Sequence, residues 1–463
     1  MLRKPLFWLL ALAFLHGAWY AIIVHPWQAP DEYLHYEYTR LIDAERTLDL
    51  WAEHRSSEIQ RPVADSMWTF QHYRYRLIPT PPEAEFRTYR TPLGSTNFTP
   101  QPPLYYLLSL PIYWLMRTRP VLDQLYILRF FSVLLLCLTA WLTYRLAKLI
   151  FSTEKDSWFA FFPAAFAALL PQYTFISASY NNDNLAPPLI AASLYALIKG
   201  YKEESKPGWL LLATVFGLLA VTTKRTSVAI LPILGLSLIF YALRWLRSGK
   251  KWVKIVAAVI LIGALLLFVA IILFLLRPQV LPQDLARHLR LSPDALVRLA
   301  SFFDNPALLA GHPWGHFANQ TIESFWGFFG WNTLHVPPIW VSLLKGTTIV
   351  LLAGILVGAV RNIIREKTER QPHLLFSILI LSAGLIFSLI TMAAQNLVAP
   401  AHYAPQGRYL FPFISGIAVL AAWSWRSFWP ESVQHKALFG GWVFLAIFDL
   451  VCWGFVIIPA WYT

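Results

Sequence analysis

Long apolar runs recur along this chain and constrain its fold more than any other feature. About eleven of them approach or reach the ~20 residues that a helix needs to cross a bilayer. The chain is 57% hydrophobic and 14% charged, which excludes an ordinary soluble fold. The runs cover residues 5–24, 122–150, 158–178, 185–199, 208–223, 226–243, 252–276, 339–360, 373–394, 409–428 and 437–459. We therefore predict an all-α polytopic membrane protein, with residues 1–463 forming one transmembrane bundle of about eleven helices.

Basic residues indicate which side of the membrane each loop occupies. Four short loops carry Lys and Arg clusters: Arg145/Lys148/Lys155, Lys199/Lys202/Lys206, Arg244/Arg247/Lys250/Lys251/Lys254 and Arg361/Arg365/Lys367/Arg370. They share a side with Arg3 and Lys4 only if the short, Pro-containing segment 103–116 does not cross. Because cytoplasmic loops are rich in Lys and Arg, this arrangement predicts a cytoplasmic N-terminus. Segment 103–116 is then an interfacial or re-entrant helix.

Two long outer loops follow from this topology, at residues 25–121 and 277–338. The first is expected to hold short juxtamembrane helices. The second contains 292–303, where Ser292 reads as an N-cap and an apolar stripe suits the membrane surface. Residues 1–24 indicate a membrane anchor rather than a cleaved signal. The predicted location is the plasma (inner) membrane.

Net charge and cysteine content exclude other classes. The net charge of +13 fits cytoplasmic Lys and Arg and contacts with anionic lipid better than it fits nucleic acid, and no nucleic-acid partner is expected. Cys137 and Cys452 both lie inside apolar runs, which predicts packed thiols and no disulfide framework.

The stretch 25–40, directly after the first apolar run, concentrates ionisable groups at a membrane boundary. Pro30 suits the first position of a helix, which would place Asp31 and Glu32 in the first turn and His35 one turn beyond Asp31. Helix capping alone would account for the two carboxylates. The other outer clusters favour a site, with Asp31, Glu32 and His35 as its catalytic candidates.

Cations stand at two further outer boundaries. Lys224 and Arg225 form a turn on the side that otherwise lacks short basic loops, and paired cations there suit a phosphate or diphosphate. Snorkelling to lipid headgroups is the alternative. Arg408, followed by Tyr409, stands at a helix start, where the dipole disfavours a cation unless an anion binds there.

Polar residues that are costly near hydrocarbon complete the set. Asn182 and Asp183 open the fourth span, and Glu323 lies in an aromatic segment of the second outer loop. They are candidates for assisting the acceptor or a metal. His312 and His316 would share a helical face, but Pro313 and Gly315 argue against that helix.

At these residues the chain resembles the C-type superfamily of membrane glycosyltransferases. That group includes protein O-mannosyltransferases, lipid A aminoarabinose transferase and oligosaccharyltransferases. The resemblance rests on five short motifs in a fixed order: Pro-Asp-Glu-Tyr-Leu-His at 30–35, Gln-Pro-Pro-Leu-Tyr-Tyr at 101–106, Asn-Asp at 182–183, Thr-Lys at 223–224 and Gln-Gly-Arg-Tyr-Leu-Phe-Pro at 406–412. Aminoarabinose transferases carry Lys-Pro-Pro where this chain has Gln101-Pro-Pro.

The resemblance implies transfer of a sugar from a polyprenyl-phosphate carrier to a lipid, glycan or protein acceptor on the extracytoplasmic face. Asp31 would be the general base, with Glu32 and His35 orienting the acceptor or a metal. Lys224, Arg225, Arg408 and Tyr409 would hold the donor phosphate, and Asn182, Asp183 and Glu323 would assist the acceptor or a metal. The cofactor stays open, and a divalent metal is one alternative.

Other functions fit parts of the pattern. A transporter or flippase would also carry polar residues in its spans, but here these residues gather at the outer boundary, without paired broken helices in matching halves. An O-antigen ligase or polymerase would differ mainly in using a diphosphate-linked donor. A scaffold would explain the topology but not the outer charges, and a soluble nucleotide-sugar donor would not reach an outer site.

Overall fold

In the computed structural model, the residues described are 5–48, 57–72, 102–151, 159–203, 206–247, 251–276, 301, 305–365, 372–398 and 405–462. The first half contains α1 (Pro5–Ile23), α2 (Glu32–Glu45), α3 (Ser57–Thr69), α6 (Leu104–Met116), α7 (Val121–Phe151), α8 (Phe161–Leu169), α9 (Pro171–Ser177), the 3-10 helix η2 (Asn182–Asn184), α10 (Ala186–Lys202), α11 (Pro207–Val221), η3 (Arg225–Ala229) and α12 (Ile230–Trp245).

The second half contains α13 (Lys251–Leu276), α16 (Pro306–Ala310), α17 (Trp314–Gly327), strands β1 (Phe328–Phe329) and β2 (Leu334–His335), α18 (Pro338–Arg365), α19 (Pro372–Val398), η5 (Gly407–Phe413), α20 (Ile414–Ser427), η6 (Glu431–Val433), α21 (Gln434–Val451), the π-helix η7 (Cys452–Ile457) and α22 (Ile458–Tyr462). The two strands pair as one antiparallel hairpin. The prediction of an all-α chain is confirmed.

Every predicted apolar run is helical in the structure. Among the described residues, six stretches are long and apolar enough to cross a bilayer alone: Pro5–Ile23, Val121–Phe151, Arg225–Trp245, Pro338–Arg361, His373–Leu397 and Glu431–Tyr462. The other runs include α11, which is shorter, and α8–α9, which break where Pro171 cannot donate a backbone hydrogen bond. The chain is thus an integral membrane protein with several spans.

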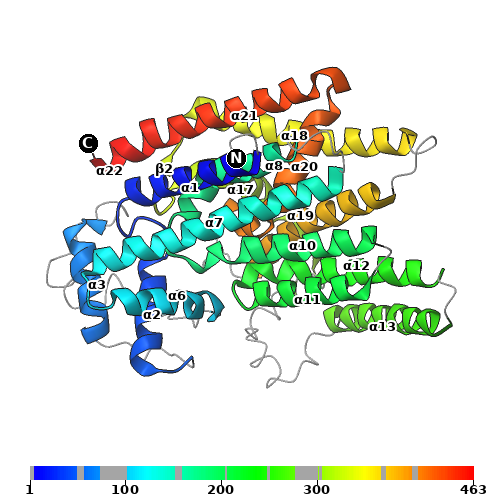
Figure 1. The fold of residues 1–463 in the computed structure, drawn as a ribbon, viewed down its shortest axis with the longest axis horizontal. Helices are drawn as coiled ribbons and strands as arrows, with labels where there is room; N and C mark the ends of the chain where they lie inside the picture. The colour runs from blue at the N-terminus through cyan, green and yellow to red at the C-terminus, as the bar shows by residue number, and fades with distance from the viewer. Residues whose placement is uncertain are drawn as a thin grey trace.

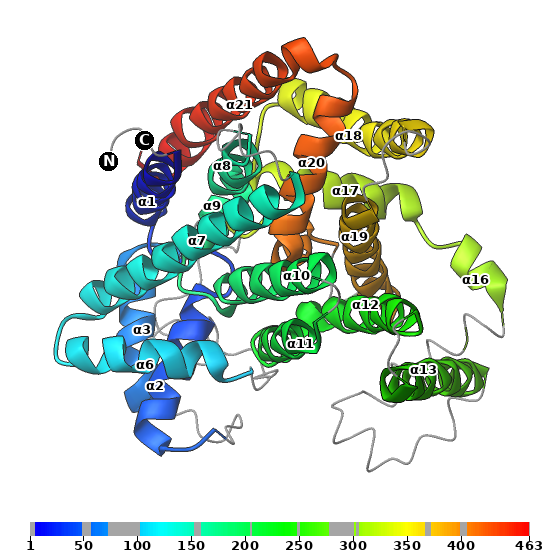
Figure 2. The same ribbon diagram turned by 45° about the vertical axis from the view of Figure 1, so that its right-hand side comes forward.

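The long helices run side by side, and several of the shorter helices lie at one end of the bundle (Figure 1). Figure 1 shows α2, α3 and α6 at the same end as β2 and α22. Figure 2 shows α18, α20 and α21 on one side of the bundle, α10, α11 and α12 on another, and α13 at the edge beyond α12. Segment 103–116 forms α6, which packs against α7 and α2. The helix expected at 292–303 lies almost entirely outside the described residues.

A polar contact inside the bundle joins the first helix to α21. His16 of α1 bonds the Ala168 carbonyl through Nδ1 (2.7 Å) and Asp449 through Nε2 (2.9 Å), while the Tyr20 hydroxyl donates to Asp449 (2.7 Å). The Ala168 carbonyl lies in the last turn of α8, where backbone acceptors lack helical partners. The His16 side chain of α1 therefore satisfies a backbone acceptor that the break before Pro171 leaves without a helical partner.

Candidate active site

A buried ion pair fixes the segment between α1 and α2. Glu32, the first residue of α2, and Arg129 of α7 are both 0% exposed, and their closest contact is 2.6 Å. The Glu32 carboxylate also accepts backbone N–H bonds from Trp27 (3.2 Å) and Tyr180 (3.0 Å). Three segments that are distant in sequence therefore converge on one carboxylate. A buried charge persists only with such compensation.

The same arginine closes the end of α1. Nη1 of Arg129 donates to the carbonyls of Ala21 (3.0 Å) and Val24 (2.6 Å), and Nη2 donates to that of His25 (3.4 Å). Carbonyls at the C-terminal end of a helix have no helical partner, so Arg129 satisfies acceptors that would otherwise be buried unpaired. The turn that follows is held from both sides, because Asn181 donates to the Pro30 carbonyl (3.2 Å).

Asp31 lies in this turn with its backbone in the left-handed region (φ 63°). The helix consequently begins at Glu32, so the prediction that Pro30 is its first residue is wrong. The Asp31 carboxylate makes no capping hydrogen bond and instead accepts one from Nη2 of Arg408 at 3.1 Å. The Asp31 side chain is 37% exposed and that of Arg408 10%, so the carboxylate lies on the open side of the pair.

A third ion pair lies beside the pair of Asp31 and Arg408. Lys224, between α11 and η3, contacts the carboxylate of Asp183 in η2. Asn182 donates to the Thr223 carbonyl (3.1 Å), which ties η2 to the turn that carries Lys224. The site thus contains two carboxylates and two cations, each carboxylate paired with one cation.

Electrostatic coupling shows that these groups form one cluster. Burial alone would raise the pKa of Asp31, but the charge of Arg408, and then those of His35 and Lys224, hold it below its ordinary value. Burial first, and then Lys224, lower the pKa of His35 to about 4, although Asp31 and Asp183 oppose this. His35 is therefore neutral at pH 7, and its Nδ1 bonds the Tyr106 hydroxyl at 2.6 Å.

Arg408 keeps unused donors at the centre of the cluster. Its Nε and Nη1 are buried and have no hydrogen-bond partner within the described part of the chain. The Tyr409 ring lies 5.4 Å from the guanidinium carbon. Gly407 brings this backbone against α17, because a Cβ there would come within 2.3 Å of the Phe325 backbone. Buried unpaired N–H groups on a cation are placed to bind an anion.

Glu323 and Arg225 complete the predicted set. Glu323 of α17 pairs with Lys345 of α18 at 2.5 Å, and Arg225 is exposed at the start of η3. Among the described residues, no group of three or more His, Cys, Asp or Glu side chains is placed to hold a metal ion. His312 precedes α17, so it shares no helical face with His316, and its Nε2 bonds Asn396 at 3.0 Å.

Sequence reasoning missed the residues that support the site. Arg129 carried a signal, since it is a charged residue inside an apolar run. Tyr180 gave a weaker signal. Its hydroxyl bonds Thr39 and Ser109, both at 2.6 Å, and thereby joins the turn before η2 to α2 and α6. Tyrosines at a membrane boundary are common, so composition alone does not distinguish this one.

Comparison with known proteins agrees with the resemblance. Residues 110–274, about a third of the chain, match the family described as dolichyl-phosphate-mannose-protein mannosyltransferase. This is a family of C-type membrane glycosyltransferases, and the match supports a membrane glycosyltransferase of the mannosyltransferase type. The matched part contains Arg129, Asp183 and Lys224. A search of curated proteins found no match to this chain.

The pH dependence of transfer follows from the two shifted pKa values. Because the pKa of Asp31 lies below its ordinary value and that of His35 is about 4, neither group titrates between about pH 5 and pH 8. We expect a flat pH–rate profile across this range and a loss of rate at lower pH, where protonation removes the base. An acid limb near pH 6.5, measured at saturating substrates, would contradict Asp31 as the base.

Proposed function

We propose that this protein transfers a sugar from a polyprenyl-phosphate donor to a lipid, glycan or protein acceptor on the extracytoplasmic face, with Asp31 as general base. The observation that carries the proposal is the pairing of a part-exposed carboxylate with a largely buried arginine that has unused donors. Glycosyl transfer needs both: a base for the acceptor hydroxyl and cations for the leaving phosphate.

The donor phosphate fits between the two cations. Arg408 supplies a planar guanidinium with free nitrogens, which suits phosphate oxygens in a forked arrangement. Lys224 supplies a point charge, held in place by Asp183 and Asn182. Tyr409 lies against the guanidinium and restricts its orientation. In this proposal Asp183 and Asn182 position Lys224, while Glu32 positions Asp31.

The transfer step needs only the donor, the acceptor and the residues of this site. Asp31 accepts the proton of the acceptor hydroxyl as its oxygen forms a bond to the anomeric carbon. The bond from that carbon to the phosphate oxygen breaks, and its electron pair stays on the phosphate, facing Arg408 and Lys224. These cations stabilise charge that develops as the bond breaks, which is the kind of stabilisation that accelerates a reaction.

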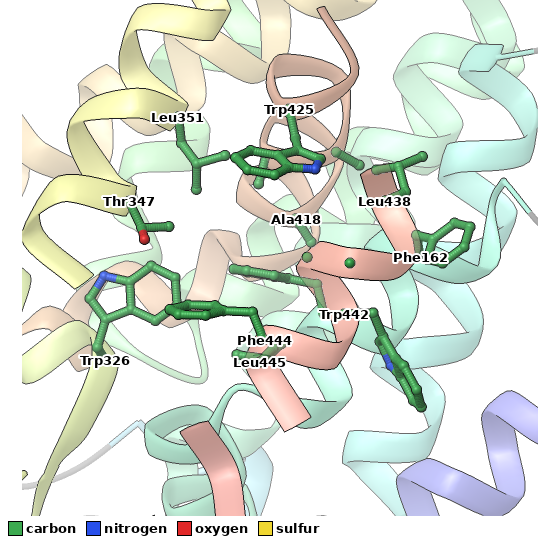
Figure 3. A pocket seen from close by; sticks show the side chains of 15 residues that line it. Phe162, Trp326, Thr347, Leu351, Ala418, Trp425, Leu438, Trp442, Phe444 and Leu445 are labelled. Carbon is green, nitrogen blue, oxygen red and sulfur yellow. The ribbon is translucent and has the colours of Figure 1, made fainter. Parts of the chain in front are cut away.

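An apolar cavity between the helices supports a lipid-linked donor. It measures about 350 Å³ and is lined mainly by apolar and aromatic residues of α8, α17, α18, α20 and α21. Figure 3 shows the rings of Trp326, Trp425 and Phe444 at its borders. Trp326 directly follows Phe325, which packs against Gly407 beside the site. An apolar cavity of this size suits a hydrocarbon chain such as that of a lipid-linked donor.

Substitution of the two cations tests the phosphate site. Lys224→Ala and Arg408→Ala are each expected to weaken donor binding by roughly 10- to 150-fold, because each removes a charge-assisted hydrogen bond worth about 1.5–3 kcal/mol. Binding of polyprenyl-phosphate mannose to purified protein in nanodiscs provides the measurement. Lys345→Ala, which removes the partner of Glu323 on α18, should bind normally. Unchanged affinity in both site variants would show that these cations do not hold the phosphate.

A further inference from the structure

In this structure Asp31, the proposed base, is hydrogen-bonded to Arg408, the residue proposed to bind the donor phosphate. Arg408 donates to one oxygen of the Asp31 carboxylate, the group that would accept a proton, and the same arginine would have to contact the leaving phosphate. While this hydrogen bond is present, Asp31 is a weaker proton acceptor and Arg408 has one donor fewer for a phosphate. The carboxylate needs an acceptor hydroxyl in front of it, and the guanidinium needs an anion.

The contact between them is of a kind that an anion can displace. It is a single hydrogen bond of 3.1 Å from Nη2, whereas strong charge-assisted bonds measure about 2.7–2.9 Å and arginine often binds carboxylates through two nitrogens. The other nitrogens, Nε and Nη1, are buried without partners in the described residues. A ligand with several acceptor oxygens would therefore satisfy donors that Asp31 leaves unused.

Neighbouring charges do not offer Asp31 an equivalent partner. Lys224 contacts Asp183, and His35 is buried, bonds Tyr106 and is neutral at pH 7. Glu32, next in sequence, is wholly occupied by Arg129 and two backbone N–H groups. If Arg408 turns to another anion, the Asp31 carboxylate is left on the open side of the cluster without a strong partner.

We propose that the Asp31–Arg408 pair is a latch that the phosphate of the lipid donor opens, so that the base becomes available to the acceptor only after the donor has bound. The proposal rests on the function proposed above. It makes donor binding the first step and acceptor binding the second. It also makes Asp31 a competitor of the donor for Arg408.

This competition has a reciprocal consequence. If the Asp31 charge weakens donor binding by some factor, donor binding must favour protonation of Asp31 by the same factor. The donor therefore makes Asp31 a stronger base at the moment it is needed. Coupling between sites in proteins typically amounts to about 5- to 150-fold, and an effect of roughly tenfold is expected here.

Binding of a phosphodiester that carries no sugar tests the latch separately from transfer. Farnesyl methyl phosphate is a suitable probe, titrated into purified full-length protein in nanodiscs. Asp31→Asn should tighten its binding roughly tenfold relative to the wild type. Asn and Gly both tolerate φ 63°, so Asp31→Gly should behave in the same way and serves if the first variant folds poorly. Asp43→Asn is the control. The Asp43 carboxylate lies within α2 and accepts a hydrogen bond from Trp114, so this change should leave binding of the probe unchanged.

A double-mutant cycle separates the latch from simple charge repulsion. In an Arg408→Gln background, Asp31→Asn should give little or no tightening, because the residue for which Asp31 competes is gone. Equal tightening in both backgrounds would overturn the latch, as would unchanged or weaker binding in Asp31→Asn alone. If the probe binds neither the wild type nor any variant, the phosphate site itself fails and the latch with it.

Discussion

Asparagine at position 31 is expected to lower the rate of sugar transfer by about 10²- to 10⁴-fold while leaving the protein folded, because it removes the proton acceptor. Asn keeps the size of the side chain and tolerates the left-handed backbone at φ 63°. The Asp31 carboxylate makes no helix-capping bond that would be lost. Transfer rate and thermal unfolding should be measured on the same preparation of Asp31→Asn.

Asp43→Asn is the matched control for this experiment. It makes the same chemical change on α2, where Asp43 accepts a hydrogen bond from Trp114 at 2.8 Å, and it should retain the wild-type rate. Wild-type turnover in Asp31→Asn would rule out Asp31 as the base. Asp31→Gly repeats the test with no side chain at all, and it should lose the same activity.

Removal of Arg129 is expected to have the largest effect on stability. Arg129→Ala leaves the Glu32 charge buried without its partner and frees the carbonyls that end α1. Breaking a buried ion pair in this way costs about 3–5 kcal/mol. A large fall in the thermal unfolding temperature of the purified protein is the expected result. Transfer should fall as well, since the turn carrying Asp31 loses its support.

Two further variants make the Arg129 experiment specific. Arg117→Ala removes an exposed arginine in the segment between α6 and α7 and should change stability by no more than about 0.5 kcal/mol. Arg129→Met combined with Glu32→Gln removes both charges and should recover part of the lost stability, because no unpaired buried charge remains. If the double variant is no more stable than Arg129→Ala, the loss of stability comes mainly from the unpaired carbonyls at the end of α1 and not from the unpaired charge of Glu32.

The sequence predicts the helices of this fold well, because bilayer crossing imposes a strong local pattern. An apolar run of sufficient length has few alternatives to a helix in lipid, and each predicted run is helical in the structure. The same reasoning selected Asp31, Asp183, Lys224 and Arg408 as candidates, since charged residues at a membrane boundary differ clearly from their apolar neighbours.

The partners of these charges could not be predicted, because they depend on contacts between distant segments. Asp31 and Arg408 lie 377 residues apart in sequence, and Glu32 and Arg129 lie 97 apart. Asp31 and Glu32, adjacent in sequence, therefore differ in role: one is part-exposed at the site and the other is buried in support of it. The local pattern also predicted the wrong start for α2, because the sequence does not indicate that the Asp31 backbone is in the left-handed region.

The most direct test of the central claim is a measurement of lipid-linked sugars in membranes that lack this protein. If the protein consumes a polyprenyl-phosphate sugar, that lipid should accumulate in a deletion strain, where mass spectrometry can detect it. Expression of the wild-type chain should return the lipid to its normal level, and expression of Asp31→Asn at equal abundance should not. An unchanged pool of polyprenyl-phosphate sugars in the deletion strain, or full restoration by Asp31→Asn, would contradict the account.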